Sequence, residues 1–249
     1  MKKLVFILAL FTSITGRLYA NDIQTAQYYY DRNDISNAMN AINAAVKVKY
    51  ADNAEAWMLM YKIYKKAQST SPYSSFPDDC ISNQHRAIRQ LMELSDGRTW
   101  MQQEFGSQYL QLFNRFYSEF VTYANGSMKN KNFGNALKNY KNALKVYDDI
   151  YKYGLDPSPV DTAVIFRAGY SAIQEEKYAE TETFFKKLAD IPVKNKQYAM
   201  IYAWLSKYYI METKDLPKAK AMFDKGLALF PDDKDLKELT TYFNSGAGQ

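Results

Sequence analysis

The stretch FGNALKNYKNALKVY, residues 133–147, decides the fold class of this chain. Its Ala136, Tyr140 and Ala143 fall at positions i, i+4 and i+7, which lie on one face of an α-helix. The lysines between them point largely to other sides of that helix. The segment is therefore predicted to be an amphipathic helix that buries small residues on either side of a large one.

The same three-residue stripe recurs at four other places in the sequence. In each copy a small residue opens, a large apolar residue follows four positions later, and a third residue comes three after that. The copies are Ala38, Ile42 and Ala45; Ala87, Leu91 and Leu94; Thr181, Phe185 and Leu188; and Ala219, Phe223 and Gly226. This recurrence indicates an internal repeat.

A second small residue precedes four of these five stripes at a nearly constant distance. The pairs are Ala26 with Ala38, Ala124 with Ala136, Gly169 with Thr181, and Ser206 with Ala219. Short polar stretches separate the members of each pair, at 32–34, 131–132, 175–177 and 213–215. Two antiparallel helices approach to about 8–10 Å only where their side chains are small. The sequence therefore predicts tight helical hairpins.

In these features the chain resembles the tetratricopeptide repeat family, whose unit of about 34 residues is a helical hairpin with small residues where its helices cross. Asn53-Ala54-Glu55-Ala56-Trp57 is similar to the family's opening. The resemblance implies an all-α fold, a right-handed superhelix of about five stacked hairpins. The expected units are 22–52, 53–96, 98–150, 159–192 and 196–231, followed by a capping helix at 233–243.

Two units depart from the family pattern. In the second unit Tyr61 stands where a small residue is expected, and residues 68–83 are predicted to form an inserted loop. In the third unit the first helix is predicted to run without interruption from about Arg98 to Ser127 and carries many aromatic residues.

The N-terminal segment MKKLVFILALFTSITGRLYA has the layout of a cleavable secretory signal, with two lysines, an apolar run and a small residue at Ala20. Residues 1–20 are therefore expected to be removed, which leaves 21–249 as one helical-repeat domain. The single cysteine, Cys80, lies far from the cleavage position, so no lipid anchor is expected. The product is expected to be periplasmic or secreted, in a bacterial envelope.

Charge and hydropathy exclude two kinds of partner. The chain has 32 basic and 27 acidic residues, and the signal contains three of the basic ones, so 29 and 27 remain, a net charge of +2. A nearly neutral chain has no extended basic field for nucleic acid. No apolar run after the signal approaches about eighteen residues, so no transmembrane segment is expected in the mature chain.

Only one pair of residues raises the question of catalysis. His85 follows Cys80 by five positions, and a cysteine with a histidine can act as nucleophile and base. The segment has the composition of a loop, however, and no thiol-enzyme motif flanks it. The sequence also has no glycine-rich phosphate loop, no HExxH and no GxSxG. We therefore expect no enzyme, no cofactor and no metal site.

The resemblance implies that the first helices of the hairpins line a concave face that holds peptides or proteins. The residues expected on that face are Gln27, Met58, Lys62, Asn125, Phe166, Tyr170 and Lys207. Trp57 and Trp204 are assigned to packing. The predicted function is a non-catalytic protein–protein interaction scaffold, with a protein or peptide as its partner. The lysine and asparagine set with which chaperone-binding members hold a terminal carboxylate is not recognisable.

Two alternatives remain open at the level of sequence. One is the capture of a glycan or nutrient, as in tetratricopeptide-containing envelope proteins of Bacteroidetes, on a platform formed by the 68–83 loop and the aromatic helix after Arg98. The other is a component of outer-membrane assembly that has five such repeats. The missing anchor cysteine counts against both.

Overall fold

A computed structural model describes residues 22–155, 161–191 and 195–245, and every regular element within these ranges is a helix. The proposed signal and Pro192 lie outside the described residues. The chain forms two compact units. Unit 1 comprises Met1–Phe120 with Lys145–Pro157, and unit 2 comprises Val121–Leu144 with Ser158–Gln249.

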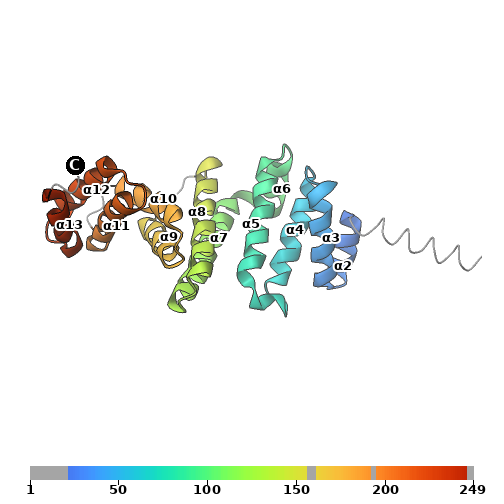
Figure 1. The fold of residues 1–249 in the computed structure, drawn as a ribbon. Coiled ribbons are helices and arrows are strands. Elements are labelled where there is room, and N and C mark those ends of the chain that lie inside the picture. Colours follow the sequence, from blue (N-terminus) through green and yellow to red (C-terminus); the bar gives the residue numbers. More distant parts are fainter. Residues whose placement is uncertain (1–21, 156–160, 192–194, 246–249) are drawn as a thin grey trace, which may run out of the picture. The chain divides into compact units, whose positions relative to one another are not determined.

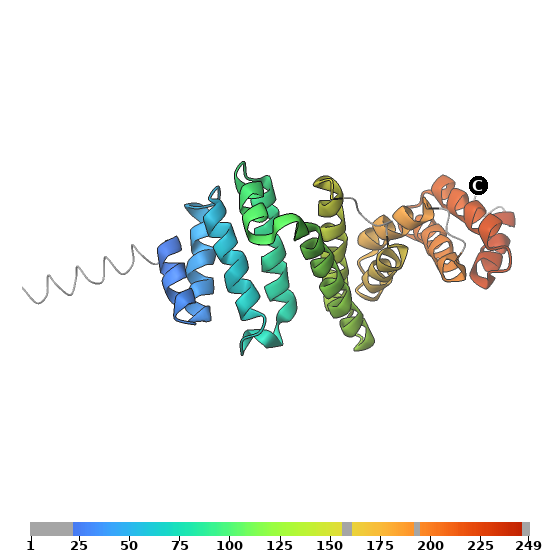
Figure 2. The ribbon, with the colours of Figure 1, turned by 180° about the vertical axis from the view of Figure 1, so that it is seen from behind.

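The helices of unit 1 pack as neighbours in chain order, α2 against α3 and α4 against α5 (Figure 1). The α4 and α5 helices also lie side by side in the view from behind (Figure 2). The elements are α2 (Ile23–Asp31), α3 (Ile35–Val48), α4 (Ala54–Ala67), η1 (Tyr73–Ser75), α5 (Pro77–Glu93), α6 (Gly97–Phe105) and η2 (Gly106–Gln108). Two further helices, α7 (Tyr109–Lys129) and α8 (Phe133–Lys152), contribute residues to both units.

Unit 2 repeats the same pairing, with α9 against α10 and α11 against α12, and α13 contacts both helices of the last pair. Its other elements are α9 (Thr162–Gln174), α10 (Tyr178–Ala189), η3 (Lys196–Tyr198), α11 (Ala199–Met211), α12 (Leu216–Leu229) and α13 (Lys234–Asn244). The expectation of an all-α chain of successive helical hairpins is therefore confirmed, and α13 is a helix where the cap was expected.

The small residues predicted at the helix crossings are all buried. The eight are Ala26, Ala38, Ala124, Ala136, Gly169, Thr181, Ser206 and Ala219. At Gly169 the approach is so close that an added Cβ would lie 2.4 Å from Cε1 of Phe185. The spacing in the sequence thus identified buried positions on both helices of each hairpin.

One turn geometry joins the two helices of three hairpins. Asn33, Lys131 and Glu176 each adopt a left-handed backbone, with φ of 60°, 58° and 55°. In each turn the next residue donates its N–H to the carbonyl five positions earlier, at 2.9 Å, which is the helix-ending arrangement of the Schellman motif. The fourth turn has its left-handed residue at Lys214 and is one residue longer, which accounts for the thirteen-residue spacing from Ser206 to Ala219.

The connection predicted as a loop over residues 68–83 is shorter than expected. Helix α5 begins at Pro77, and Cys80 and His85 lie buried on it. Proline fits the first turn of a helix because the missing N–H would have no partner there, and Asp78 and Asp79 favour the same helix end. The prediction of a loop over residues 77–83 was therefore wrong.

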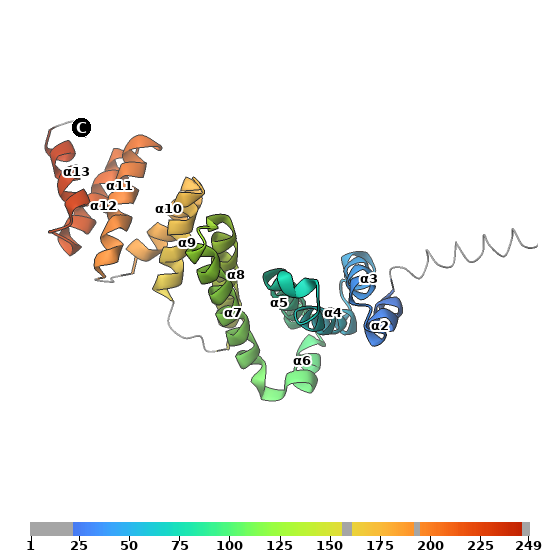
Figure 3. The same cartoon turned by 90° about the horizontal axis from the view of Figure 1, so that it is seen from below.

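The long first helix predicted from Arg98 to Ser127 is also interrupted. It ends at Phe105, and Gly106 takes φ 58° and ψ −138°, a backbone conformation open to glycine. Figure 3 shows the change of direction between α6 and α7. The aromatic side chains at Phe113, Phe116 and Phe120 are completely buried, so they do not form the expected ligand platform.

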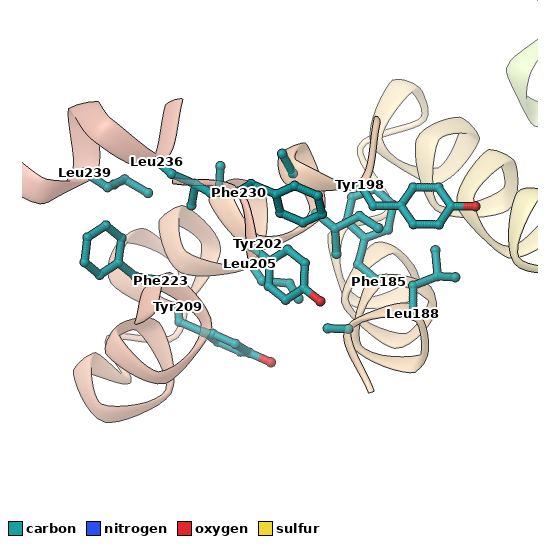
Figure 4. Close-up of a cluster of buried hydrophobic side chains, with 14 of the residues drawn as sticks. Phe185, Leu188, Tyr198, Tyr202, Leu205, Tyr209, Phe223, Phe230, Leu236 and Leu239 are labelled. Atoms are coloured by element: carbon teal, nitrogen blue, oxygen red, sulfur yellow. The ribbon is translucent and has the colours of Figure 1, made fainter. Parts of the chain in front are cut away.

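The core of unit 2 is rich in aromatic residues. Tyr202 of α11 lies between the hairpins, with its ring 5.9 Å from that of Phe230 (Figure 4). Phe185 and Leu205 are completely buried in the same cluster. This core fixes α9 and α11 as neighbouring first helices, and their outer sides form the site described next.

Candidate functional site

The structure separates the seven residues predicted on the binding face. Gln27, Asn125 and Lys207 are exposed, while Lys62, Phe166 and Tyr170 are half-buried. Met58 is 2% exposed, so the prediction that it contacts a partner was wrong. The reason is that α4 packs against α2, α3, α5 and α6, which leaves little of its surface free.

The two other candidates of unit 1 are engaged within the chain. Gln27 donates from Nε2 to Oδ1 of Asp31 at 2.6 Å. Nζ of Lys62 lies 2.9 Å from Oε2 of Glu104 in an ion pair. Neither residue belongs to the two hollows described below.

In unit 2, by contrast, three of the predicted residues come together around a hollow of about 470 Å³, here called the Arg167 hollow. Phe166 and Tyr170 line it, and Asn125 reaches its edge through a hydrogen bond to Arg167. The other lining residues are Met128, Ala163, Asn195, Gln197, Tyr198 and Met200. The hollow thus draws on the first helices α7, α9 and α11.

Helix α9 presents its lining residues because of where it begins and which side it buries. Asp161 caps it by accepting hydrogen bonds from the N–H groups of Ala163 and Val164. Ala163, Phe166 and Tyr170 then recur at i, i+3 and i+7 on one face. The opposite face is fixed by the buried residues Ile165, Ala168, Gly169 and Ala172.

Hydrogen bonds that lead to α7 and α8 hold the Arg167 side chain. Its Nη1 donates to Oδ1 of Asn125 at 2.8 Å, and the same oxygen accepts from the hydroxyl of Tyr140 at 2.7 Å. The Tyr140 side chain is fully buried, and burial raises its pKa while the Arg167 charge opposes that rise. The buried Tyr140 hydroxyl therefore holds the exposed Asn125, and Asn125 in turn holds one end of the exposed Arg167 guanidinium.

The Arg167 hollow has an unbalanced charge. Arg167 is the one formally charged side chain among the lining residues. Within the part of the chain that the structure describes, no carboxylate forms an ion pair with it. Sequence reasoning missed this residue, although Phe166 and Tyr170 on either side of it were selected.

Aromatic rings form much of the wall. The rings of Phe166 and Tyr198 lie 5.2 Å apart, and Tyr170 is 6.2 Å from Phe133. The Tyr198 hydroxyl is 3.1 Å from Oγ1 of Thr162, a hydrogen bond that ties the start of α11 to the start of α9. The aromatic part of the wall is therefore held in position by contacts within unit 2.

A second hollow of about 290 Å³, here called the Trp204 hollow, lies further along the same helices. It is lined by Ile173, Tyr178, Trp204, Lys207, Tyr208, Met211 and Glu212. The rings of Trp204 and Tyr208 stack 5.0 Å apart at 11°, and Trp204 also meets Phe185 edge-on. Trp204 thus packs as predicted and in addition lines a surface hollow, whereas Trp57 is buried and lines neither hollow.

Both hollows occupy the same sides of α9 and α11. Ile173 extends the α9 stripe of Ala163, Phe166 and Tyr170, and Met200, Trp204, Lys207 and Met211 form a matching stripe on α11. At 1.5 Å per residue, the α9 stripe from Ala163 to Ile173 is about 15 Å long. An extended chain rises about 3.3 Å per residue, so about five residues would cover this length.

Cys80 and His85 do not form a nucleophile and base. Burial raises the pKa of the Cys80 thiol to about 11, which disfavours the reactive thiolate. His85 directs Nε2 toward Oδ2 of Asp149 at 2.9 Å, and Arg89 contacts the same carboxylate. Burial is the main cause that lowers the pKa of His85.

Across residues 22–155, 161–191 and 195–245, no three histidine, cysteine or acidic side chains are grouped so that they could hold a metal ion. In these same ranges no helix combines the length and the apolar character needed to cross a membrane. The fold defines an all-helical protein of stacked antiparallel helix pairs. No family model matches the chain, and no curated protein matches it either.

Proposed function

We propose that this chain is a non-catalytic binding protein that holds an extended segment of a protein partner on the outer sides of α9 and α11. The observation that carries the proposal is the placement of both hollows on first helices, lined by aromatic and methionine side chains. Such side chains are enriched where proteins contact one another. Helical-repeat proteins use the corresponding face for the same purpose.

The finer architecture belongs to the same proposal. Three turns of the chain share one backbone geometry, and the small residues are regularly spaced. Both features support a tetratricopeptide-like array. Stacking of such hairpins with a constant rotation from one to the next would give a superhelix, and the resemblance to the tetratricopeptide repeat family implies that it is right-handed.

We also propose that the protein works in the bacterial envelope, in the periplasm or outside the cell. The support is the N-terminal segment, with its two lysines, apolar run and Ala20. N-terminal sequencing of the protein from the native cell should then begin at Asn21. A mature chain that still begins at Met1 would contradict export by cleavage.

Site-specific photo-crosslinking in the native cell tests the binding face. A benzophenone amino acid is placed at Tyr170, at Lys207, or at the exposed Lys187 on α10 as the matched control. We expect crosslinks to one and the same partner segment from Tyr170 and Lys207 and none from Lys187. Equal labelling from all three positions, or from none, would contradict the proposed face.

Glycan capture is a second candidate because of one observation, the stacked and half-buried pair of Trp204 and Tyr208. Stacked aromatic rings that are partly open to solvent can pack on the apolar face of a sugar. Calorimetric titration with a panel of oligosaccharides would detect this activity, and the variant Trp204→Ala should abolish any heat of binding. Absence of binding across the panel would remove the candidate.

A further inference from the structure

We propose that the Arg167 hollow recognises an acidic side chain, Asp or Glu, within an extended segment of the partner. The inference deepens the proposed function and rests on it. The inference assigns a ligand chemistry to one position on α9. It is argued from the surroundings of Arg167, which do not depend on how the rest of the bound segment lies.

The first step concerns charge. Arg167 is the one charged lining residue, and no carboxylate in the described parts of the chain pairs with it. A guanidinium prefers a carboxylate partner because its planar fork can donate two parallel hydrogen bonds. A partner that contributes one acidic side chain would supply the charge that the hollow lacks.

The second step concerns preorganisation. Asn125 holds one edge of the guanidinium through Nη1 at 2.8 Å, and the buried hydroxyl of Tyr140 fixes Asn125. Because the arginine is already partly oriented, its own side chain loses less conformational entropy when a ligand pairs with it than an unconstrained surface arginine would. The remaining nitrogens of the guanidinium are left to donate to the ligand.

The third step concerns the surroundings of the charge. Phe166 and Tyr170 flank Arg167 on the same face of α9, and both are half-buried. A segment that packs on these rings would exclude water from the ion pair and strengthen it relative to an exposed pair. The residues next to the acidic one should therefore be apolar or aromatic.

The fourth step decides between an internal side chain and a chain terminus. The lining stripe continues past Arg167 in both directions, to Ala163 and Tyr198 on one side and to Ile173 and the Trp204 hollow on the other. A bound segment can therefore extend on both sides of the acidic residue. The Arg167 guanidinium would then pair with an acidic side chain of the bound segment, and the main chain of that segment would continue along the stripe in both directions.

A peptide library tests this chemistry. Random nonapeptides, acetylated at the N-terminus and joined to beads through a C-terminal amide, offer no terminal carboxylate. They are screened with the full mature chain, with Arg167→Gln, and with Lys187→Gln as the control for loss of one positive charge on an exposed position of the same unit. We expect Asp or Glu to be enriched at one position between apolar residues, with the wild type and with Lys187→Gln but not with Arg167→Gln.

Individual peptides from the screen sharpen the result. Replacing the enriched Glu by Gln should weaken binding to the wild type about tenfold and binding to Arg167→Gln less than about twofold, because the two changes remove the same interaction. Arg167→Lys, which keeps the charge but not the fork, should fall between the two. Unchanged thermal midpoints and circular dichroism spectra of the variants would verify that they fold.

The outcomes separate this inference from the proposed function. Peptides that bind without an acidic preference, or whose preference survives Arg167→Gln, would overturn the inference and leave peptide binding intact. Binding that appears only when a free C-terminal carboxylate is offered would overturn it as well. If no peptide is retained by any form of the protein, the proposed function fails and the inference fails with it.

Discussion

Single residues at the helix crossings set how closely the hairpins pack. At Gly169 the α9 backbone lies so close to Phe185 that no side chain would fit between them. At Gly226 the α12 backbone lies similarly close to Tyr202. Gly126, in α7, has nothing within 4 Å of the position where a Cβ would lie. The same residue type is therefore required at two of these positions and free to change at the third.

Alanine substitutions should separate the two kinds of glycine. Gly169→Ala should lower the free energy of unfolding by about 1–3 kcal/mol, because the methyl group would overlap the completely buried ring of Phe185, which would have to shift. Gly126→Ala should raise it by about 0.5–1 kcal/mol, since alanine is the better helix former. Urea unfolding of both variants measures the difference, and a Gly169→Ala protein as stable as the wild type would refute the close crossing.

Trp57 gives a second prediction at this scale. It is 3% exposed, and its indole N–H donates to the carbonyl of Ala51 at 2.7 Å. Trp57→Ala should cost about 3–5 kcal/mol, as the truncation of large buried rings does. Trp57→Phe keeps most of the packing and loses the hydrogen bond, so it should cost distinctly less. Thermal melts of the two variants give the comparison, and an unchanged midpoint for Trp57→Ala would contradict its place in the core.

Among the elements, the hairpins were predictable from sequence because helix packing leaves a periodic trace. Small residues spaced by twelve positions in three pairs and by thirteen in the fourth indicate where two helices pack, and all eight residues are buried. The turns were visible only as short polar stretches, and their left-handed backbone could not be predicted, because the positions that adopt it are occupied by Asn33, Lys131, Glu176 and Lys214 and not by glycine. Local composition was misleading in one place. The serines, prolines and aspartates after residue 68 are typical of a loop, so the sequence did not predict that α5 begins at Pro77.

The shared turn yields a prediction at the scale of the element. Lys131 has φ of 58°, a conformation that costs an L-residue about 1 kcal/mol or more and glycine little. Lys131→Gly should therefore stabilise the protein, by less than about 1 kcal/mol because glycine also gains freedom in the unfolded chain. Lys131→Val should destabilise it, since a β-branched side chain tolerates this backbone poorly. Chemical denaturation of the pair tests the turn, and equal stability of both variants would count against it.

The whole chain distributes its candidate site unevenly between the two units. Of the seven residues that the sequence selected, Asn125, Phe166 and Tyr170 meet around one hollow and Lys207 lines the next. Alignment to a repeat selects positions that are expected to face outward, but it could not show that Met58 is buried or that Lys62 already forms an ion pair with Glu104. The importance of Arg167 depends on a contact between α7 and α9, 42 residues apart in sequence.

The two units should also differ in their response to acid, because His85 is the one histidine of the chain and belongs to unit 1. Its ring lies among Phe113, Phe116 and Phe120, and burial holds its pKa below the ordinary value of 6.5. The nearby charges act in both directions: Asp149 raises this pKa, whereas Arg89 and Lys145 lower it further. The net direction means that the folded chain binds a proton less readily than the unfolded chain does.

The stability that neutral His85 provides should be complete above about pH 6.5 and fall as the pH drops below that value, because the unfolded state then gains the proton first. The loss can be at most about 1.4 kcal/mol per pH unit for one proton. Carboxylates titrate mainly below this range. Urea unfolding at pH 7.5 and 5.5 should show the decrease for the wild type and not for His85→Gln, which lacks the titrating group. Hydrogen exchange should place the loss of protection in α5 of unit 1 and leave α9 to α12 unchanged; an equal loss in both units would assign the acid sensitivity to other groups.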